Sequence, residues 1–296
     1  MTDDTPPRMF KSPEGEARFL AAYDTVLRDW PVPYEERDIP TRFGSTHVIA
    51  SGPPDAPPVV LLHSLSASAT VWRANVKPLS ERHRVYAVDV IGQPGKSIPS
   101  RMLRDRDDYA AWLGDVLDGL GVMRATLIGS SFGAFLSMNQ AIKAPQRVEK
   151  LVLIGPAGTF AGLPLRFYYT MLVRGPLLRL LRGRKPEVPA ALPAGIMLNP
   201  GDEAWGALMR IVMMDSARPI TIMASVFSRA EMRGVRAPAL LLVGEKEVLY
   251  DAHALVKRAM VRMPGLRAAV VKGAHHIAAQ SKPDDVNARI LQFLGG

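Results

Sequence analysis

The chain has 296 residues, of which 48% are hydrophobic and 22% charged, a composition typical of a soluble globular protein with one large domain or one domain and an insertion. It contains no cysteine, which excludes disulfides, a thiolate nucleophile and a cysteine-based metal site. The first residues are polar and no apolar run approaches the roughly 20 residues of a bilayer span, so we expect a cytoplasmic protein without stable membrane insertion.

Predicted helices and strands alternate along most of the chain. An N-terminal amphipathic helix is indicated by apolar residues that recur at 3–4–3 spacing from Leu20 to Trp30. Helical stretches at 107–120 and 132–144 lie between short, near-continuous apolar runs, which are typical of a parallel sheet covered on both faces. The alternation predicts an open α/β sheet whose site lies at the carboxyl ends of the strands. The predicted strands are 46–50, 58–63, 84–88, 125–129, 150–154, 239–243 and 268–271.

The alternation breaks once, between about Thr159 and Arg233, where helix-like pieces separated by proline and glycine take the place of strands. We interpret this region as a helical cap inserted into the core. The predicted division is therefore 1–158 for the first part of the core with its N-terminal helix, 159–233 for the cap, and 234–296 for the second part of the core.

The net charge of +9 is concentrated in one place. Residues 166–185 include six basic residues and no acidic one, interspersed with leucines. We favour a lid whose arginines face water; the alternative is a basic amphipathic helix that associates peripherally with an anionic membrane surface. The interleaved aromatic and basic residues of a nucleic-acid module are missing, so no nucleic-acid partner is expected.

Residues 129–133 read Gly-Ser-Ser-Phe-Gly, between an apolar run that predicts a strand and a stretch with the composition of a helix. Strand, G-x-S-x-G and helix together indicate a nucleophile elbow, a turn so sharp that glycine is needed two residues before and after the serine. This spacing selects Ser131, flanked by Gly129 and Gly133, over Ser130. The alternative is a serine that merely caps the helix.

A serine hydroxyl is a good nucleophile only beside a base that a third group orients. In proteins with this elbow, the acid and the histidine follow the serine in the chain. Here Glu245 and Glu247 come after the next-to-last predicted strand, and His275 and His276 come after the last one. Candidates for both roles therefore occur in the expected order.

Three longer segments resemble the α/β-hydrolase fold family and, more narrowly, bacterial carboxylesterases of the naproxen-esterase type. They are 41–53 (TRFGSTHVIASGP), 86–92 (YAVDVIG) and 244–251 (GEKEVLYD). The resemblance to the fold family covers nearly the whole chain, whereas the cap resembles the esterase group much less. It implies an α/β-hydrolase fold: a mostly parallel eight-stranded sheet with helices on both faces and an inserted helical cap.

The resemblance implies that Glu247 is the acid. Many family members have aspartate at this position, and the closer esterases have glutamate, which is one methylene longer and still accepts the imidazole N–H. A plain surface charge is the alternative for Glu247, as it is for the neighbouring acids Glu245 and Asp251.

The same comparison implies that His276 is the base. The family tail of a proline followed by Val-Asn is then matched by Pro283 and residues 286–287. His275 occupies the position where family members usually have glycine.

Two backbone N–H groups are expected to bind the developing oxyanion. One belongs to Phe132, directly after the nucleophile. The resemblance places the other on Leu65, in the loop after the strand 58–63, where Ser64 stands in place of the usual glycine. His63 is expected to brace this loop.

Together these residues imply a serine hydrolase that cleaves small hydrophobic esters, with alkyl or aryl groups, through an acyl-enzyme and without a metal or organic cofactor. The same machinery serves carbon–carbon hydrolases of aromatic ring-fission products and acyl transferases, so these are alternatives. A non-catalytic ligand-binding homologue is a third, and it would be expected to have lost part of the triad.

Overall fold

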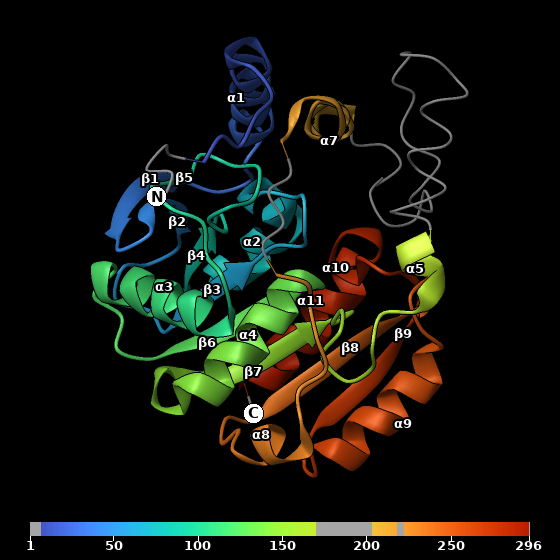
Figure 1. The fold of residues 1–296 in the computed structure, drawn as a ribbon. Coiled ribbons are helices and arrows are strands. Elements are labelled where there is room, and N and C mark those ends of the chain that lie inside the picture. The colour runs from blue at the N-terminus through green and yellow to red at the C-terminus, as the bar shows by residue number, and fades with distance from the viewer. Residues whose placement is uncertain (1–6, 170–202, 218–221, 296) are drawn as a thin grey trace.

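The computed structural model describes residues 7–169, 203–217 and 222–295 (Figure 1). Most of the predicted basic lid, 166–185, lies outside the described residues. In the described ranges, no helix is long and apolar enough to cross a bilayer. The helices are α1 (Pro13–Arg28), α2 (Arg73–Ser80), α3 (Arg106–Gly119), α4 (Phe132–Lys143), α5 (Leu165–Tyr169), α7 (Glu203–Asp215), α8 (Arg229–Arg233), α9 (Ala252–Arg262), α10 (Ala278–Ser281) and α11 (Pro283–Gly295).

In the described part of the chain the sheet has nine strands, eight of them in the order β1-β2-β4-β3-β6-β7-β8-β9, with β5 paired to β2. The pairs from β4 to β9 are parallel, and β1 and β2 are antiparallel at one edge. This is the α/β-hydrolase architecture that the resemblance implied. The strands are β1 (Tyr34–Thr41), β2 (Gly44–Ser51), β3 (Pro58–Leu62), β4 (Arg84–Val88), β5 (Ile98–Pro99), β6 (Ala125–Ser130), β7 (Val148–Ile154), β8 (Ala239–Lys246) and β9 (Arg267–His275).

Two of these strands, β1 and β5, were not predicted from the sequence. In β1, only Ile39 is buried and most of the other side chains are exposed. This is an edge strand held by its antiparallel ladder to β2, so it has no apolar run to reveal it. β5 has two residues and depends on the same partner strand.

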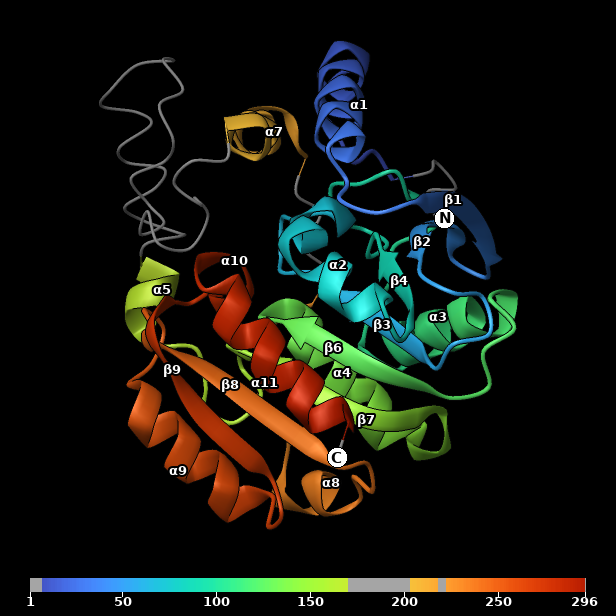
Figure 2. The ribbon, with the colours of Figure 1, turned by 180° about the vertical axis from the view of Figure 1, so that it is seen from behind.

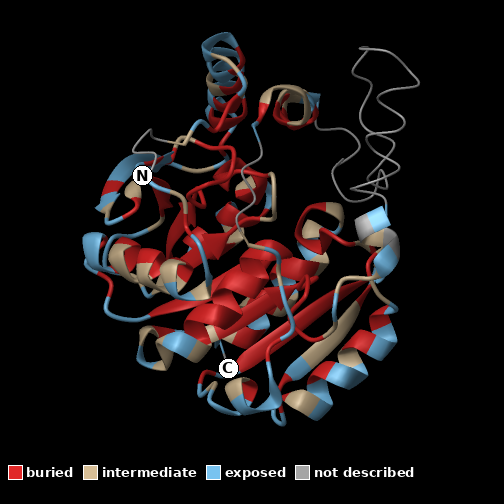
Figure 3. Ribbon diagram, in the orientation of Figure 1, coloured by how far each residue is buried: buried red, intermediate tan, exposed pale blue. Residues whose placement is uncertain are grey.

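Helices cover both faces of the sheet. In Figure 1, α3 and α4 lie in front of the strands, and in Figure 2, seen from behind, α2, α10 and α11 do. Figure 3 shows that the central strands and α4 are almost entirely buried between these layers. The apolar runs of the central strands therefore reflect burial on both faces.

The N-terminal helix α1 packs against α7, and the two lie together in both views (Figures 1 and 2). Arg18 pairs with Asp215 at 3.0 Å, and Phe10 forms a β-bridge with Ser216. The N-terminal helix, predicted as part of the core, therefore also contacts the region predicted as the cap.

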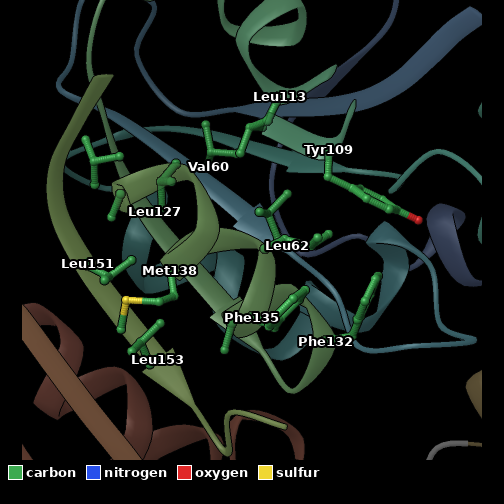
Figure 4. Packing of buried hydrophobic residues seen from close by; sticks show 14 of the residues in the cluster. Val60, Leu62, Tyr109, Leu113, Leu127, Phe132, Phe135, Met138, Leu151 and Leu153 are labelled. Atoms are coloured by element: carbon green, nitrogen blue, oxygen red, sulfur yellow. The ribbon is translucent and has the colours of Figure 1, made fainter. Parts of the chain in front are cut away.

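A row of aromatic rings leads away from the predicted elbow. The Phe132 ring meets Tyr109 edge-on, with centroids 5.9 Å apart, and stacks on Phe135 at 6.0 Å. Phe135 stacks in turn on Phe227 at 5.0 Å. Figure 4 shows Tyr109, Phe132 and Phe135 among the buried leucines of this face. The row joins α3, α4 and Phe227, which lies in the C-terminal part of the region predicted as the cap.

Removing the central ring tests how far this row supports the fold. Phe135 is fully buried, so Phe135→Ala should lower the free energy of unfolding by about 3–5 kcal/mol, through lost burial and the cavity left behind. Denaturant unfolding measures this loss. Met123→Ala is the control, because Met123 is 86% exposed and its truncation should change stability by less than about 0.5 kcal/mol. Equal effects of the two substitutions would contradict this description of the core.

Candidate active site

Ser131 lies at the corner between β6 and α4, with φ 52° and ψ −108°. Non-glycine residues rarely adopt positive φ, so the turn stores backbone strain. The Ser131 N–H donates to the Ile154 carbonyl, 2.8 Å away on β7, and this bond holds the strained residue against the neighbouring strand. The local geometry is that of a nucleophile elbow.

The two flanking glycines are required by close backbone contacts. A Cβ on Gly129 would lie 2.2 Å from the Gly133 carbonyl oxygen, and one on Gly133 would lie 2.0 Å from the Leu62 carbonyl oxygen. Real Cβ atoms do not approach so closely, so a side chain at either position would push the start of α4 away from β3 or β6. The glycines therefore set the distance between the elbow and the end of β3.

The structure brings Ser131 and His276 together with Glu247. The Ser131 Oγ lies 2.9 Å from His276 Nε2, and His276 Nδ1 lies 2.8 Å from both carboxylate oxygens of Glu247. In the neutral tautomer that this arrangement favours, Nδ1–H donates to Glu247 and Nε2 accepts the Ser131 hydroxyl proton. The three side chains come from the ends of β6, β9 and β8, far apart in sequence.

Glu247 is held as a carboxylate. Its side chain has no exposed surface, and burial alone would raise its pKa. Hydrogen bonding and electrostatic interaction with His276, together with the N–H groups of Leu249 and Val248, outweigh burial, so the pKa of Glu247 lies below the ordinary 4.5. The Leu249 N–H donates to Oε1 at 2.8 Å.

The neighbouring candidates make other contacts. Glu245 is exposed and accepts the Gly273 N–H at 2.8 Å, and Asp251 caps the N-terminus of α9 through the Ala254 N–H at 2.7 Å. His275 is the last residue of β9, and its backbone N–H donates to Ser281 Oγ at 3.0 Å.

His63 spans the loop after β3 and contacts the turn that follows β4. Its Nδ1–H donates to the Ser64 carbonyl at 2.8 Å, and its Nε2 accepts the Val90 N–H at 2.9 Å. Burial lowers the pKa of His63 by more than the Asp89 charge raises it, so the ring stays neutral. The two hydrogen bonds then set which nitrogen carries the proton.

The loop from Ser64 to Ser66 needs no glycine at position 64. Among the described residues, Ser66 and Ser131 are the non-glycine residues with positive φ, so Ser64 is unstrained. Its hydroxyl lies 3.2 Å from that of Ser130 in the elbow. The Ser66 N–H donates to the buried Gln93 side chain at 2.9 Å.

Gln93, which supports this loop, was not predicted from the sequence. It lies in the turn that follows β4, 27 residues beyond Ser66, and it resembles any polar turn residue until the fold places it under the loop. Leu65, half-buried, lies in this supported loop, and Phe132 begins α4, where backbone N–H groups have no acceptor within the helix.

The model of the alpha/beta hydrolase family matches residues 59–289. The chain belongs to this family. It is 38% identical to carboxylesterase nap of Bacillus subtilis (strain 168), over 94% of this chain and 92% of that protein. It is 36% identical to carboxylesterase YbfK of the same organism, over 97% of each chain. The resemblance to naproxen-type esterases is thereby confirmed.

A solved structure agrees with these relatives. The crystal structure of naproxen esterase from Bacillus subtilis superposes with a TM-score of 0.84 and 36% identity, over 96% of this chain and 99% of that one. Among the described residues of this family member, no group of three or more His, Asp or Glu side chains is arranged to hold a metal ion.

The lowered pKa of Glu247 predicts a pH-dependent stability. The folded state binds the Glu247 proton more weakly than the unfolded chain does, so this group stabilises the fold fully above its ordinary pKa of 4.5. The contribution is lost as pH falls through the lowered folded pKa. Melting temperatures of the wild type and of Glu247→Gln should therefore differ most near neutral pH, and the difference should shrink as pH falls below the ordinary carboxyl pKa of 4.5. A gap that stays constant down to pH 3 would contradict the assignment.

Proposed function

We propose that the protein is a serine carboxylesterase in which Ser131 is the nucleophile, His276 the general base and Glu247 the orienting acid. The observation that carries the proposal is the continuous hydrogen-bonded series from Ser131 Oγ through the His276 ring to the buried Glu247 carboxylate. The full-length similarity to proteins named carboxylesterases supports the ester as the bond cleaved.

In the acylation step, His276 Nε2 accepts the Ser131 proton as Oγ attacks the ester carbonyl carbon. The resulting oxyanion accepts hydrogen bonds from the N–H groups of Phe132 and Leu65, each worth about 2.7–4 kcal/mol by analogy with a subtilisin oxyanion donor. His276 then donates its proton to the ester oxygen, the C–O bond breaks and the alcohol leaves. The acyl group remains on Ser131.

In the second step, water replaces the alcohol and repeats the sequence. His276 accepts a proton from water, the hydroxide adds to the acyl carbon, and the proton passes to Ser131 Oγ as the acid is released. Glu247 remains ionised throughout and stabilises the imidazolium that forms in each step.

The substrate that we propose is a small ester with a hydrophobic acyl or aryl group. The similarity to naproxen esterase is compatible with an aryl group in the acid part. The cap boundaries 159 and 233, membrane association through 166–185 and the cytoplasmic location remain predictions.

Ser131→Ala should reduce hydrolysis of p-nitrophenyl butyrate by about 10⁴-fold or more, because the hydroxyl that forms the acyl-enzyme is lost. Initial rates of purified protein measure this effect. Ser80→Ala is the control: Ser80 is a buried serine whose hydroxyl donates to the Lys77 carbonyl on α2, and this variant should retain full activity. Turnover that survives in Ser131→Ala would overturn the assignment.

A further inference from the structure

Tyr250 lies in the short connection between the acid and helix α9. Three residues before it, Glu247 bonds to His276, and directly after it, Asp251 caps the helix with a 2.7 Å bond to the Ala254 N–H. The ring of Tyr250 is half-buried against the core of this face. The backbone that carries it is therefore anchored on both sides.

The hydroxyl of Tyr250 makes two hydrogen bonds to a different part of the chain. It accepts the Gly158 N–H at 2.8 Å and donates to the Ala161 carbonyl at 3.0 Å. Donor and acceptor capacity are both used on one backbone segment, residues 155–161, which leaves β7 and leads to α5 and the predicted cap. One hydroxyl therefore links the acid loop to this exit segment.

The exit segment touches the proposed catalytic residues at one end. Gly155 has φ 50°, and a Cβ there would lie 2.5 Å from the His276 carbonyl oxygen and 3.5 Å from Glu247 Oε2. The Gly155 N–H is held by the Leu242 carbonyl at 2.8 Å. This end of the segment is fixed by β8 and does not depend on Tyr250.

The other end contacts residues 224–227, called here the return segment, which lie in the C-terminal part of the region predicted as the cap. A Cβ on Gly158 would lie 2.5 Å from the Ala224 backbone, and the Phe227 N–H donates to the Thr159 carbonyl at 3.3 Å. The exit and return segments are therefore packed on each other. A shift of residues 158–161 would move both connections to the cap together.

We propose that Tyr250 is a positioning residue whose hydroxyl ties residues 158–161, and residues 224–227 packed on them, to the loop that carries Glu247. Ser131, His276 and Glu247 are held by their own hydrogen bonds, whereas Gly158 and Ala161 each form a hydrogen bond to this hydroxyl. The proposal deepens the esterase function and rests on it for its kinetic part.

The test is Tyr250→Phe, which removes the hydroxyl and keeps the ring. Loss of one or two net hydrogen bonds should raise KM for p-nitrophenyl hexanoate about three- to ten-fold, because the segment after β7 leaves the carboxyl edge of the sheet beside the elbow, where a longer acyl group would extend. For p-nitrophenyl acetate, kcat and KM should change less than about two-fold. Tyr34→Phe, on the exposed edge strand β1, is the matched control and should leave both esters unaffected.

Residue-resolved amide hydrogen exchange supplies a readout independent of activity. In Tyr250→Phe, the Gly158 amide loses its acceptor and should exchange roughly ten-fold faster, while the Gly155 amide keeps its protection. Unchanged exchange at Gly158, or an equal loss of activity on acetate and hexanoate, would overturn the proposal. If the wild type hydrolysed no ester, the esterase function would fail, and exchange at Gly158 would still decide whether the tether exists.

Discussion

The contact between the start of α4 and the end of β3 determines where the reactive groups lie. Because Gly133 has no side chain, its Cα approaches the Leu62 carbonyl so closely that a Cβ would lie only 2.0 Å from it. This contact brings the first residues of α4 beside the loop that carries Leu65, and it leaves Ser131 at positive φ with its hydroxyl 2.9 Å from His276. The proposed nucleophile, base and oxyanion donors therefore share one corner of the sheet.

Burial and hydrogen bonding together determine the charge states of Glu247 and His63 in that corner. Glu247 and His63 are both buried, but Glu247 is charged and His63 is neutral. Hydrogen bonds from His276 and from backbone N–H groups keep Glu247 ionised, whereas His63 makes two bonds that suit a neutral ring. A negative charge is thus held next to His276, the proposed base, which would become positive during catalysis, and His63 adds no competing charge.

Local patterns predicted much of this arrangement. The glycine spacing around Ser131 and the apolar runs of the central strands reflect short-range sterics and burial, which a sequence displays directly. The choice of Glu247 and His276 over their neighbours needed the family resemblance, because adjacent residues of the same type have no distinguishing local pattern. The structure gives those neighbours other contacts.

The contributors that were not predicted act through contacts between distant parts of the chain. Gln93 supports the loop at Ser66, and α1 packs on α7. Gly155 has no side chain and therefore allows the His276 backbone to approach closely. Each resembles an ordinary turn or helix residue until the fold supplies its partner. The edge strand β1 was not predicted for a related reason: it is held by its ladder to β2 and has no apolar pattern in the sequence.

The most direct test of the account is to treat the protein with a fluorophosphonate and locate the adduct by peptide mass spectrometry. The reagent phosphonylates an activated serine oxygen with loss of fluoride. We predict one adduct, on Ser131, formed in the wild type and at a rate reduced by at least about 10³-fold in His276→Ala, because the base that accepts the serine proton is gone. An adduct on another serine, or labelling of Ser131 that does not depend on His276, would contradict the central claim.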